Sequence, residues 1–188
     1  MMFAASRPIL IPMLLLLNVA LIYHPVAEAM PLEASNDDGF GIVTRSISPD
    51  DFKIGYAVEG TFLAPDRGRV HLDLIDDEGR NRLLHVDARY KTPGAGYPNT
   101  LITNSNINSE GWGKEEYLSG YDFTPGILVT LRVEAKDGYF RIIVNGQELG
   151  TFQYRVPDVT SVSRIQLRYR DYQAEQKAEL RSLSIYYQ

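Results

Sequence analysis

Apolar and polar residues alternate at every second position in several short runs of this chain, which favours β-structure. The runs that alternate cover residues 70–74, 129–135, 140–144, 165–170 and 183–187. A period of two places one set of side chains against a core and the other set toward water. Asp137-Gly138 separates two of these runs and Asn145-Gly146 follows the second. Such pairs favour two-residue hairpin turns because both positions tolerate positive φ. We therefore predict an all-β fold, a two-sheet antiparallel sandwich of jelly-roll type, with three consecutive antiparallel strands joined by these turns.

The first 29 residues have the pattern of a secretory signal peptide. Arg7 precedes an apolar run from Ile9 to Tyr23, and Ala27-Glu28-Ala29 offers small residues at the two positions that a signal peptidase reads. The run is shorter than the roughly 20 residues of a membrane span, and Pro12 and Asn18 weaken it as a transmembrane helix. We expect cleavage after Ala29 and a secreted, extracellular protein without stable membrane insertion. An uncleaved membrane anchor is the alternative.

The rest of the chain has the composition of a single globular domain. Residues 30–44 are polar and rich in turn formers, so we expect a flexible lead-in, followed by one domain over residues 45–188. Cysteine is absent, which excludes disulfides and thiolate chemistry. The formal charge of −5, with interspersed signs, argues against a nucleic-acid partner. Arg164, Arg168 and Arg170 are the nearest approach to a basic cluster, and we expect them to form a solvated face.

The candidate functional residues lie between Leu83 and Tyr117. If residues 83–90 form an extended strand, His85, Asp87 and Arg89 share one face and the residues between them face the core. A strand over residues 100–105 can lie alongside and add Asn104. Trp112, flanked by glycines, offers a flat apolar plate next to Glu115. Fixed hydrogen-bonding groups beside an aromatic ring suit a sugar, which has hydroxyls at its edge and C–H groups on one face.

The order His85-x-Asp87-x-Arg89, Asn104, Trp112-Gly113-x-Glu115 resembles the galectin carbohydrate-recognition domain. In that family the pattern is His-x-Asn-x-Arg, a later Asn, then Trp-Gly-x-Glu-x-Arg. The likeness extends to residues 70–74 and 140–157, and so covers most of the chain from about residue 45. It implies a galectin or concanavalin-like sandwich that binds galactose-containing glycans without catalysis, cofactor or metal. Pairing of exposed terminal strands into a homodimer, as in many family members, is a further possibility.

The resemblance also implies a role for each residue. His85 and Arg89 would bond the axial 4-hydroxyl and the ring oxygen of galactose. Asn104 and Glu115 would bond the 6-hydroxyl and the neighbouring sugar, and Trp112 would stack on the apolar face of galactose. An ion pair between Arg89 and Glu115 would hold both side chains in place before the sugar arrives.

Two positions depart from the family pattern. Asp87 replaces an Asn, which exchanges an amide that donates and accepts for a carboxylate that only accepts. Tyr117 replaces the last Arg, which removes one partner of Glu115 and one contact to the second sugar. Of the nearby polar residues, we expect His71 to be solvated and Glu116 to face away from the site.

Three other functions remain open from the sequence. A glycosidase would use the carboxylates of Asp87 and Glu115, although an acid beside Arg89 should stay ionised and donate no proton. A metal-dependent lectin would use Asp87, Asn104 and Glu115 as oxygen ligands for calcium, although Arg89 lies among them. The third is a galectin-like fold that has lost galactose binding and serves as a protein-interaction or other-glycan-binding module. The two departures from the family pattern favour this third alternative most.

Overall fold

The computed structural model describes residues 40–48, 52–76, 78–91, 99–108, 110–156, 159, 161–171 and 173–188. The expected signal peptide, residues 1–29, and residues 30–39 of the expected lead-in lie outside the described residues. Every regular element in the described part of the chain is a strand. No helix there has the length and apolar character needed to cross a membrane.

The described part of the chain forms eleven strands. In order they are β1 (Phe40–Ser46), β2 (Tyr56–Leu63), β3 (Arg69–Asp76), β4 (Arg82–Arg89), β5 (Thr100–Asn106), β6 (Glu116–Leu118), β7 (Leu128–Lys136), β8 (Tyr139–Val144), β9 (Gln147–Gln153), β10 (Val162–Arg170) and β11 (Glu179–Tyr187). Each run that alternates in the sequence falls inside one of them.

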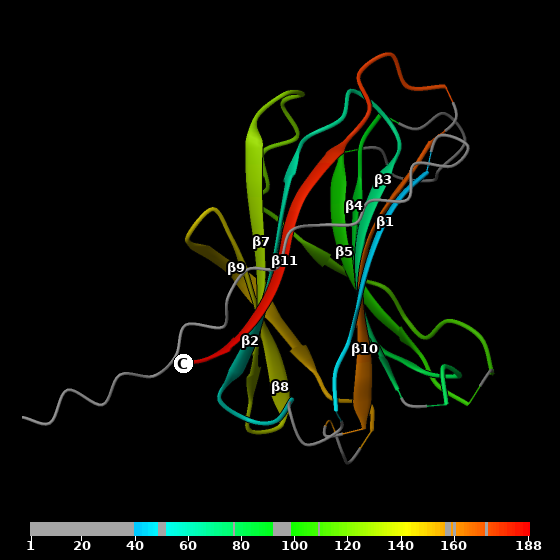
Figure 1. The fold of residues 1–188 in the computed structure, drawn as a ribbon, viewed down its shortest axis with the longest axis vertical. Coiled ribbons are helices and arrows are strands. Elements are labelled where there is room, and N and C mark those ends of the chain that lie inside the picture. The colour runs from blue at the N-terminus through cyan, green and yellow to red at the C-terminus, as the bar shows by residue number, and fades with distance from the viewer. Residues whose placement is uncertain are drawn as a thin grey trace, which may run out of the picture.

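The strands build two antiparallel sheets that face each other (Figure 1). The six-stranded sheet has the order β1-β10-β3-β4-β5-β6, and the five-stranded sheet has the order β11-β2-β7-β8-β9. The three consecutive strands predicted around the two turns are β7, β8 and β9, which pair in sequence. The predicted two-sheet sandwich is therefore confirmed.

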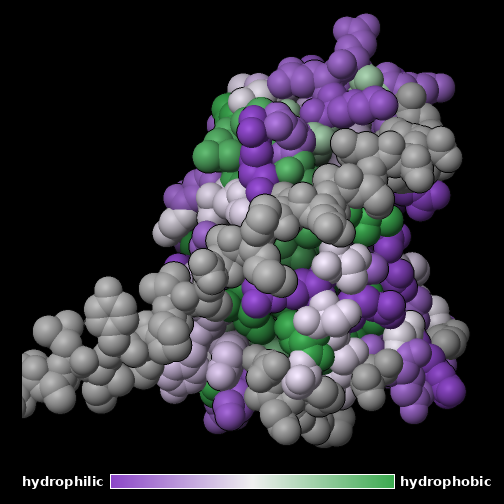
Figure 2. All heavy atoms as spheres, in the orientation of Figure 1, coloured by the Kyte–Doolittle hydropathy of each residue, from purple (hydrophilic) through white to green (hydrophobic). Residues whose placement is uncertain are grey.

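The core lies between the sheets and is made by every second residue of the strands. On β4, Leu84, Val86 and Ala88 have at most 1% exposure. They belong to the same buried cluster as residues of the other sheet such as Phe62 and Val133. Burial of side chains of this size is worth about 1.5–3 kcal/mol each. In the side view of Figure 2, apolar residues show between the sheets, and hydrophilic residues gather at the upper end of the molecule.

The two predicted hairpin turns differ in backbone conformation. Asn145 and Gly146 both have positive φ, 49° and 80°, as the mirror-image turn between β8 and β9 requires. At the turn between β7 and β8 only Gly138 does, with φ of 82°. Both pairs still join antiparallel neighbours through two residues.

The first strand corrects the predicted extent of the lead-in. Residues 40–44, assigned to a flexible segment, belong to β1, which pairs with β10 over its whole length from Phe40↔Arg170 to Ser46↔Arg164. The residues of β1 carry a weak alternation of their own. Pairing with the edge of β10 determines their conformation, and that pairing cannot be inferred from the local sequence.

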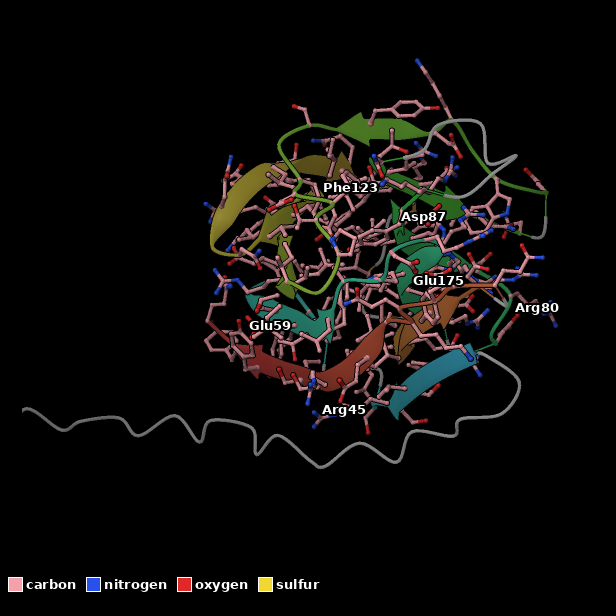
Figure 3. The ribbon with its side chains drawn as sticks, turned by 90° about the horizontal axis from the view of Figure 1, so that it is seen from above. Arg45, Glu59, Arg80, Asp87, Phe123 and Glu175 are labelled. Atoms are coloured by element: carbon pink, nitrogen blue, oxygen red, sulfur yellow. The ribbon has the colours of Figure 1, made fainter. Side chains whose placement is uncertain are left out.

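The register of the six-stranded sheet aligns its outward-facing polar residues in rows across the strands. One row is Asp73, His85 and Asn104, from β3, β4 and β5. The next row pairs His71 with Asp87, and the third pairs Arg69 with Arg89. Figure 3 labels Asp87 on this sheet and Glu59 on the other. The fold thus builds a grid of charged groups on one outer face.

Candidate functional site

The six residues predicted to bind a ligand lie on this outward face or in the segment before its last strand. His85, Asp87 and Arg89 are on β4, Asn104 is on β5, and Trp112 and Glu115 lie between β5 and β6. All except Asp87 line one cavity of about 390 Å³. The structure therefore brings together the residues that the sequence pattern singles out.

Asp87 does not line the cavity but contacts Arg69, His71 and Arg89, which do. Its side chain points away from the core, as predicted, but it has 0% exposure. Arg69 donates to both carboxylate oxygens, and Arg89 Nε donates to Oδ2 at 2.7 Å. Burial alone would raise the pKa of this carboxyl, but His71, Arg69 and His85 lower the pKa by more, to well below its usual range. Asp87 is therefore ionised and holds two guanidinium groups in fixed positions.

Arg89 joins Asp87 to Glu115 across the cavity. Its Nη2 donates to Glu115 Oε1 at 2.5 Å, so the expected ion pair is present. The bond from Arg89 is also the main reason that the pKa of Glu115 is lowered. Tyr117, which we expected to remove one partner of Glu115, instead supplies one, because its hydroxyl donates to Oε2 at 2.9 Å. That expectation was wrong, because a phenol can bond a carboxylate in place of a guanidinium.

His85 is oriented by Asp73 on the neighbouring strand. Nδ1 of His85 lies 2.5 Å from Asp73 Oδ1. Burial raises the pKa of Asp73, but the bond to His85 and nearby charges outweigh it, and the pKa is lowered. An ionised Asp73 can only accept a hydrogen bond, so Nδ1 of His85 carries the proton and is the donor. Nε2 lies 3.9 Å from Asp87 Oδ2 and, without a proton in this tautomer, can accept a hydrogen bond.

His71 corrects another expectation. We predicted a solvated side chain, but His71 has 7% exposure and its ring packs on that of His85 with centroids 4.8 Å apart. Its Nε2 lies 3.2 Å from Asp87 Oδ1, without the alignment of a hydrogen bond. Burial is the main cause of its lowered pKa, which keeps His71 neutral at pH 7. His71 is buried because the strand register places it directly opposite Asp87, and this register is not visible in the sequence.

Trp112 provides an exposed aromatic surface at the cavity wall. It has 51% exposure, and its ring lies 4.6 Å from that of His85 at an angle of 47°. Arg82 Cζ lies 5.8 Å from its centroid. A bridge between Asn106 and Trp112, together with the bond from Gly113 N to Ser105 O at 2.9 Å, ties this segment to the end of β5. The ring is therefore held at a defined place while much of it stays open to solvent.

Asn104 fastens the Trp112 segment to the sheet. Its Nδ2 donates to Gly113 O at 3.0 Å, and its Oδ1 accepts from Arg155 Nη1 at 2.9 Å. Arg155 also donates to Lys114 O at 2.6 Å and to Glu116 Oε1 at 3.0 Å. Glu116 thus faces away from the cavity, as predicted. The second hydrogen of the Asn104 amide is the group that remains for a ligand.

Sequence reasoning missed four residues that shape the site. Arg69, His71 and Asp73 occupy alternate positions of β3, and the alternation recognised there could have placed the last two beside His85 and Asp87. Arg155 follows β9 and reaches Asn104 across 51 positions of the chain, for which no local signal exists.

The arrangement has chemical consequences for two of the alternatives. Asp87 and Glu115 both have lowered pKa values, so neither carries the proton that glycoside cleavage needs from an acid. Arg89 occupies the space between the same two carboxylates, and the Asn104 oxygen accepts from Arg155. These oxygens are therefore already bonded to cationic side chains, which disfavours calcium.

A β-sandwich that carries fixed polar groups beside an open indole ring is a saccharide-binding class of protein. Residues 50–173 match the sequence profile of the family described as "Galactoside-binding lectin". A "Galactose-binding lectin" of Chondrilla caribensis is 32% identical over 121 residues, which are 62% of this chain and 83% of that lectin. The "32 kDa beta-galactoside-binding lectin" of Caenorhabditis elegans is 26% identical over 141 residues, 72% of this chain and 47% of that protein.

Solved structures agree with the sequence matches. A tetrameric galectin from Cinachyrella sp., a ball sponge, superposes with a TM-score of 0.69 at 33% identity, and the match covers 78% of this chain and 99% of that one. The chain belongs to the galactoside-binding lectin family, the galectins. It is accordingly a carbohydrate-binding lectin and not an enzyme.

Proposed function

We propose that this chain is a secreted lectin that binds β-galactoside-containing glycans in the cavity over β4, β5 and the Trp112 segment. The observation that carries the proposal is the ion pair of Arg89 with Glu115, anchored on buried Asp87 beside half-exposed Trp112. This places rigid donors, an acceptor and an apolar plate around one space of about 390 Å³. Both lectins matched in sequence carry galactose or galactoside binding in their names.

Each group has a role that its contacts favour. His85 and Arg89 bond the axial 4-hydroxyl and ring oxygen of galactose, because Asp73 orients the His85 ring so that Nε2 can accept from a hydroxyl, and Asp87 orients the Arg89 guanidinium donors. Glu115 accepts from hydroxyls of galactose and of the next sugar. The ring of Trp112 stacks on the C–H face of galactose. Asp87 contributes indirectly, since its oxygens are occupied by Arg69 and Arg89.

The N-terminal pattern underlies the proposal of secretion. Arg7, the apolar run after it and Ala27-Glu28-Ala29 are the basis for export and cleavage after Ala29. Mass spectrometry of the protein recovered from the medium of expressing cells tests it. A mature N-terminus at Met30 is expected, and retention of residues 1–29 in the membrane fraction would contradict it.

Isothermal titration with lactose tests the sugar specificity. We expect binding to lactose, none to glucose, and no change on addition of calcium or a chelator. Trp112→Ala should lose about 1–3 kcal/mol of binding free energy if its ring stacks as aromatic rings do on bases. Tyr187→Ala is the matched control, because Tyr187 is an aromatic residue of 54% exposure on the other sheet. No heat with millimolar lactose would reject the galactoside proposal, and a glycan array would then separate another sugar from a protein partner.

A further inference from the structure

Three buried side chains on the outward face of the six-stranded sheet have the chemistry of metal ligands. His71, His85 and Asp87 each offer one ligand atom, and these atoms lie within 4.8 Å of one another. They are the one such group in the part of the chain that the structure describes. The two histidines also line the cavity, which gives an ion and a further ligand access from solvent.

His71 has a nitrogen that the rest of the fold leaves without a partner. Its Nε2 is buried, makes no hydrogen bond among the described residues, and lies 3.2 Å from Asp87 Oδ1. Two electron-rich atoms this close need a proton or a cation between them, and the alignment of a hydrogen bond is not met. Zinc binds nitrogen and carboxylate oxygen at about 2.0–2.2 Å in a tetrahedron, which places its ligand atoms about 3.4 Å apart. The two atoms therefore have the separation of a pair of zinc ligands.

His85 is held in the orientation of a metal ligand. Asp73 accepts from its Nδ1 at 2.5 Å, and Arg82 Nε lies 3.5 Å from the same carboxylate. A carboxylate behind the imidazole fixes the tautomer and the ring orientation of ligating histidines in many metal sites. Nε2 is then the free nitrogen, 3.9 Å from Asp87 Oδ2. Side-chain shifts on the order of 1 Å bring it to the separation that a shared ion requires.

This ligand set favours zinc and not calcium. Calcium coordinates oxygen atoms, whereas imidazole is a preferred ligand of zinc and of neighbouring transition metals. Two imidazole nitrogens and one carboxylate match the protein ligands of open zinc sites, in which water or another exchangeable ligand takes the fourth position. The cavity beside the two histidines has room for that ligand.

Nearby arginines limit the affinity for an ion. Arg69 and Arg89 donate to Asp87. Arg168 and Arg170, which we expected on a solvated face, line the cavity as well. Arg69 is 32% exposed and can turn toward water. Arg89 bonds Oδ2 of Asp87, which leaves a lone pair of Oδ1 for the ion. We therefore expect binding in the micromolar range, weaker than that of structural zinc sites.

We propose that His71, His85 and Asp87 form a binding site for a zinc ion, and that this ion competes with the glycan. In the proposed galactoside site, Nε2 of His85 accepts from the 4-hydroxyl of galactose, and the same atom is a ligand of the zinc ion. Zinc is therefore an inhibitor of glycan binding. The competition rests on the proposed galactoside function, whereas the zinc site itself does not.

Titration with zinc chloride tests the site, on protein that was purified without a histidine tag and freed of metal with a chelator. We expect one zinc ion per chain. Cobalt(II) binds the same ligand types and quenches indole fluorescence. It should quench Trp112, the single tryptophan of the chain, because the indole ring lies 4.6 Å from that of His85. Lactose affinity should fall roughly tenfold with zinc at about ten times its own dissociation constant.

His71→Gln removes a ligand and should lower zinc affinity by more than the roughly 10–100-fold that loss of an outer hydrogen-bond partner costs. Near-UV circular dichroism shows whether this variant is folded, and the cobalt quenching in the unmodified protein does not depend on it. Glu134→Gln is the matched control, because Glu134 is also a buried carboxylate among cations but lies on the other sheet. It should keep the full zinc affinity.

Absence of zinc heat and of cobalt quenching would overturn the zinc site. Equal zinc affinity in folded His71→Gln and in the wild type would also overturn it. Zinc that binds at these residues without weakening lactose would overturn the competition. Failure of lactose to bind the metal-free protein would reject the galactoside function, and the zinc titration would still decide the metal site.

Discussion

On each sheet of the sandwich, one of the outward-facing carboxylates is buried beneath several basic side chains. Asp87 on β4 has 0% exposure, and Glu134 on β7 has 2%. Glu134 is contacted by Arg132 at 2.7 Å, Lys136 at 3.0 Å and Arg141 at 3.3 Å. Both carboxyls have lowered pKa values, because burial, which raises the pKa, is outweighed by the surrounding donors and charges. A buried, ionised carboxylate surrounded by basic side chains therefore occurs on both sheets.

The two faces differ in how far the cations themselves are buried. The cations around Glu134 are 30–38% exposed. Around Asp87, Arg69 is 32% exposed as well, but Arg89 is only 12% exposed, and the neutral His71 beside them is 9% exposed. The cations around Glu134 have further partners on the same face, as in the ion pair of Arg141 with Glu148. Around Asp87, Arg89 continues to Glu115 in the segment that carries Trp112. Exposed ion pairs are screened by water, while buried ones fix geometry. Only the Asp87 network presents rigid donors to a ligand.

Removal of the Asp87 carboxylate should have the largest effect. Asp87→Ala leaves Arg69 and Arg89 without their central acceptor, and we expect a loss of about 3–5 kcal/mol in the free energy of unfolding, with loss of lactose binding. Urea denaturation measures the first and titration the second. Asp87→Asn keeps the size of the side chain and removes its charge. If both variants unfold like the wild type, the network does not stabilise the fold.

The equivalent change on the other face should be milder. Glu134→Gln leaves three cations that are already partly solvated, so we expect a loss of about 1–2 kcal/mol in stability and unchanged lactose affinity. Urea denaturation and titration beside Asp87→Asn give the direct comparison. A loss of stability as large as that of Asp87→Ala would mean that the exposure of the cations does not distinguish the faces.

A smaller effect is expected from Tyr117, at the edge of the binding network. Tyr117→Phe removes the hydroxyl that donates to Glu115 and should weaken lactose binding by about 0.5–1 kcal/mol, or two- to fivefold. Stability should not change, because Tyr117 is 50% exposed. Tyr187→Phe on the other sheet is the control in the same titration. Unchanged lactose affinity in Tyr117→Phe would show that this bond does not position Glu115.

The smallest effect is expected on mild acidification from pH 7 to pH 6. In the unfolded chain, His71 takes up a proton near its ordinary pKa of 6.5. In the folded protein the pKa of His71 is lowered, so the side chain stays neutral to a lower pH. Unfolding therefore takes up a proton, and stability should fall as the pH falls. Thermal unfolding of the wild type and of His71→Gln measures this, with a flatter pH dependence in the variant. Equal slopes in the two proteins would exclude His71 as the source.

Much of the fold follows from local patterns. The alternation in β3, β4, β7, β8, β10 and β11 is visible in the sequence, and Asn145-Gly146 predicts the hairpin between β8 and β9. By contrast, β1 was assigned to a flexible segment. Its pairing with β10 joins parts of the chain more than a hundred positions apart, as Ser46 and Arg164 show. The β-propensity of a short segment does not indicate which distant strand it will pair with.

The candidate site divides in the same way. The identities of His85, Arg89, Trp112 and Glu115, and their common face, follow from the period of a strand and from the family pattern. The burial and the hydrogen-bond partners of the site residues do not follow from these patterns. The burial of Asp87 depends on Arg69 and Arg89 lying over it, and the anchoring of Asn104 depends on Arg155.

The sequence by itself determined that this chain is a β-sandwich of the galectin family with one polar face, because side-chain alternation and residue order are local properties. Only the tertiary structure decided which polar groups are buried as supports and which remain open to a ligand. The physical reason is that burial, pKa and hydrogen-bond partners depend on cross-strand register and on which guanidinium group reaches which carboxylate. Arg168 and Arg170 of β10 show this most clearly, since they line the cavity only through the pairing of β10 with β3.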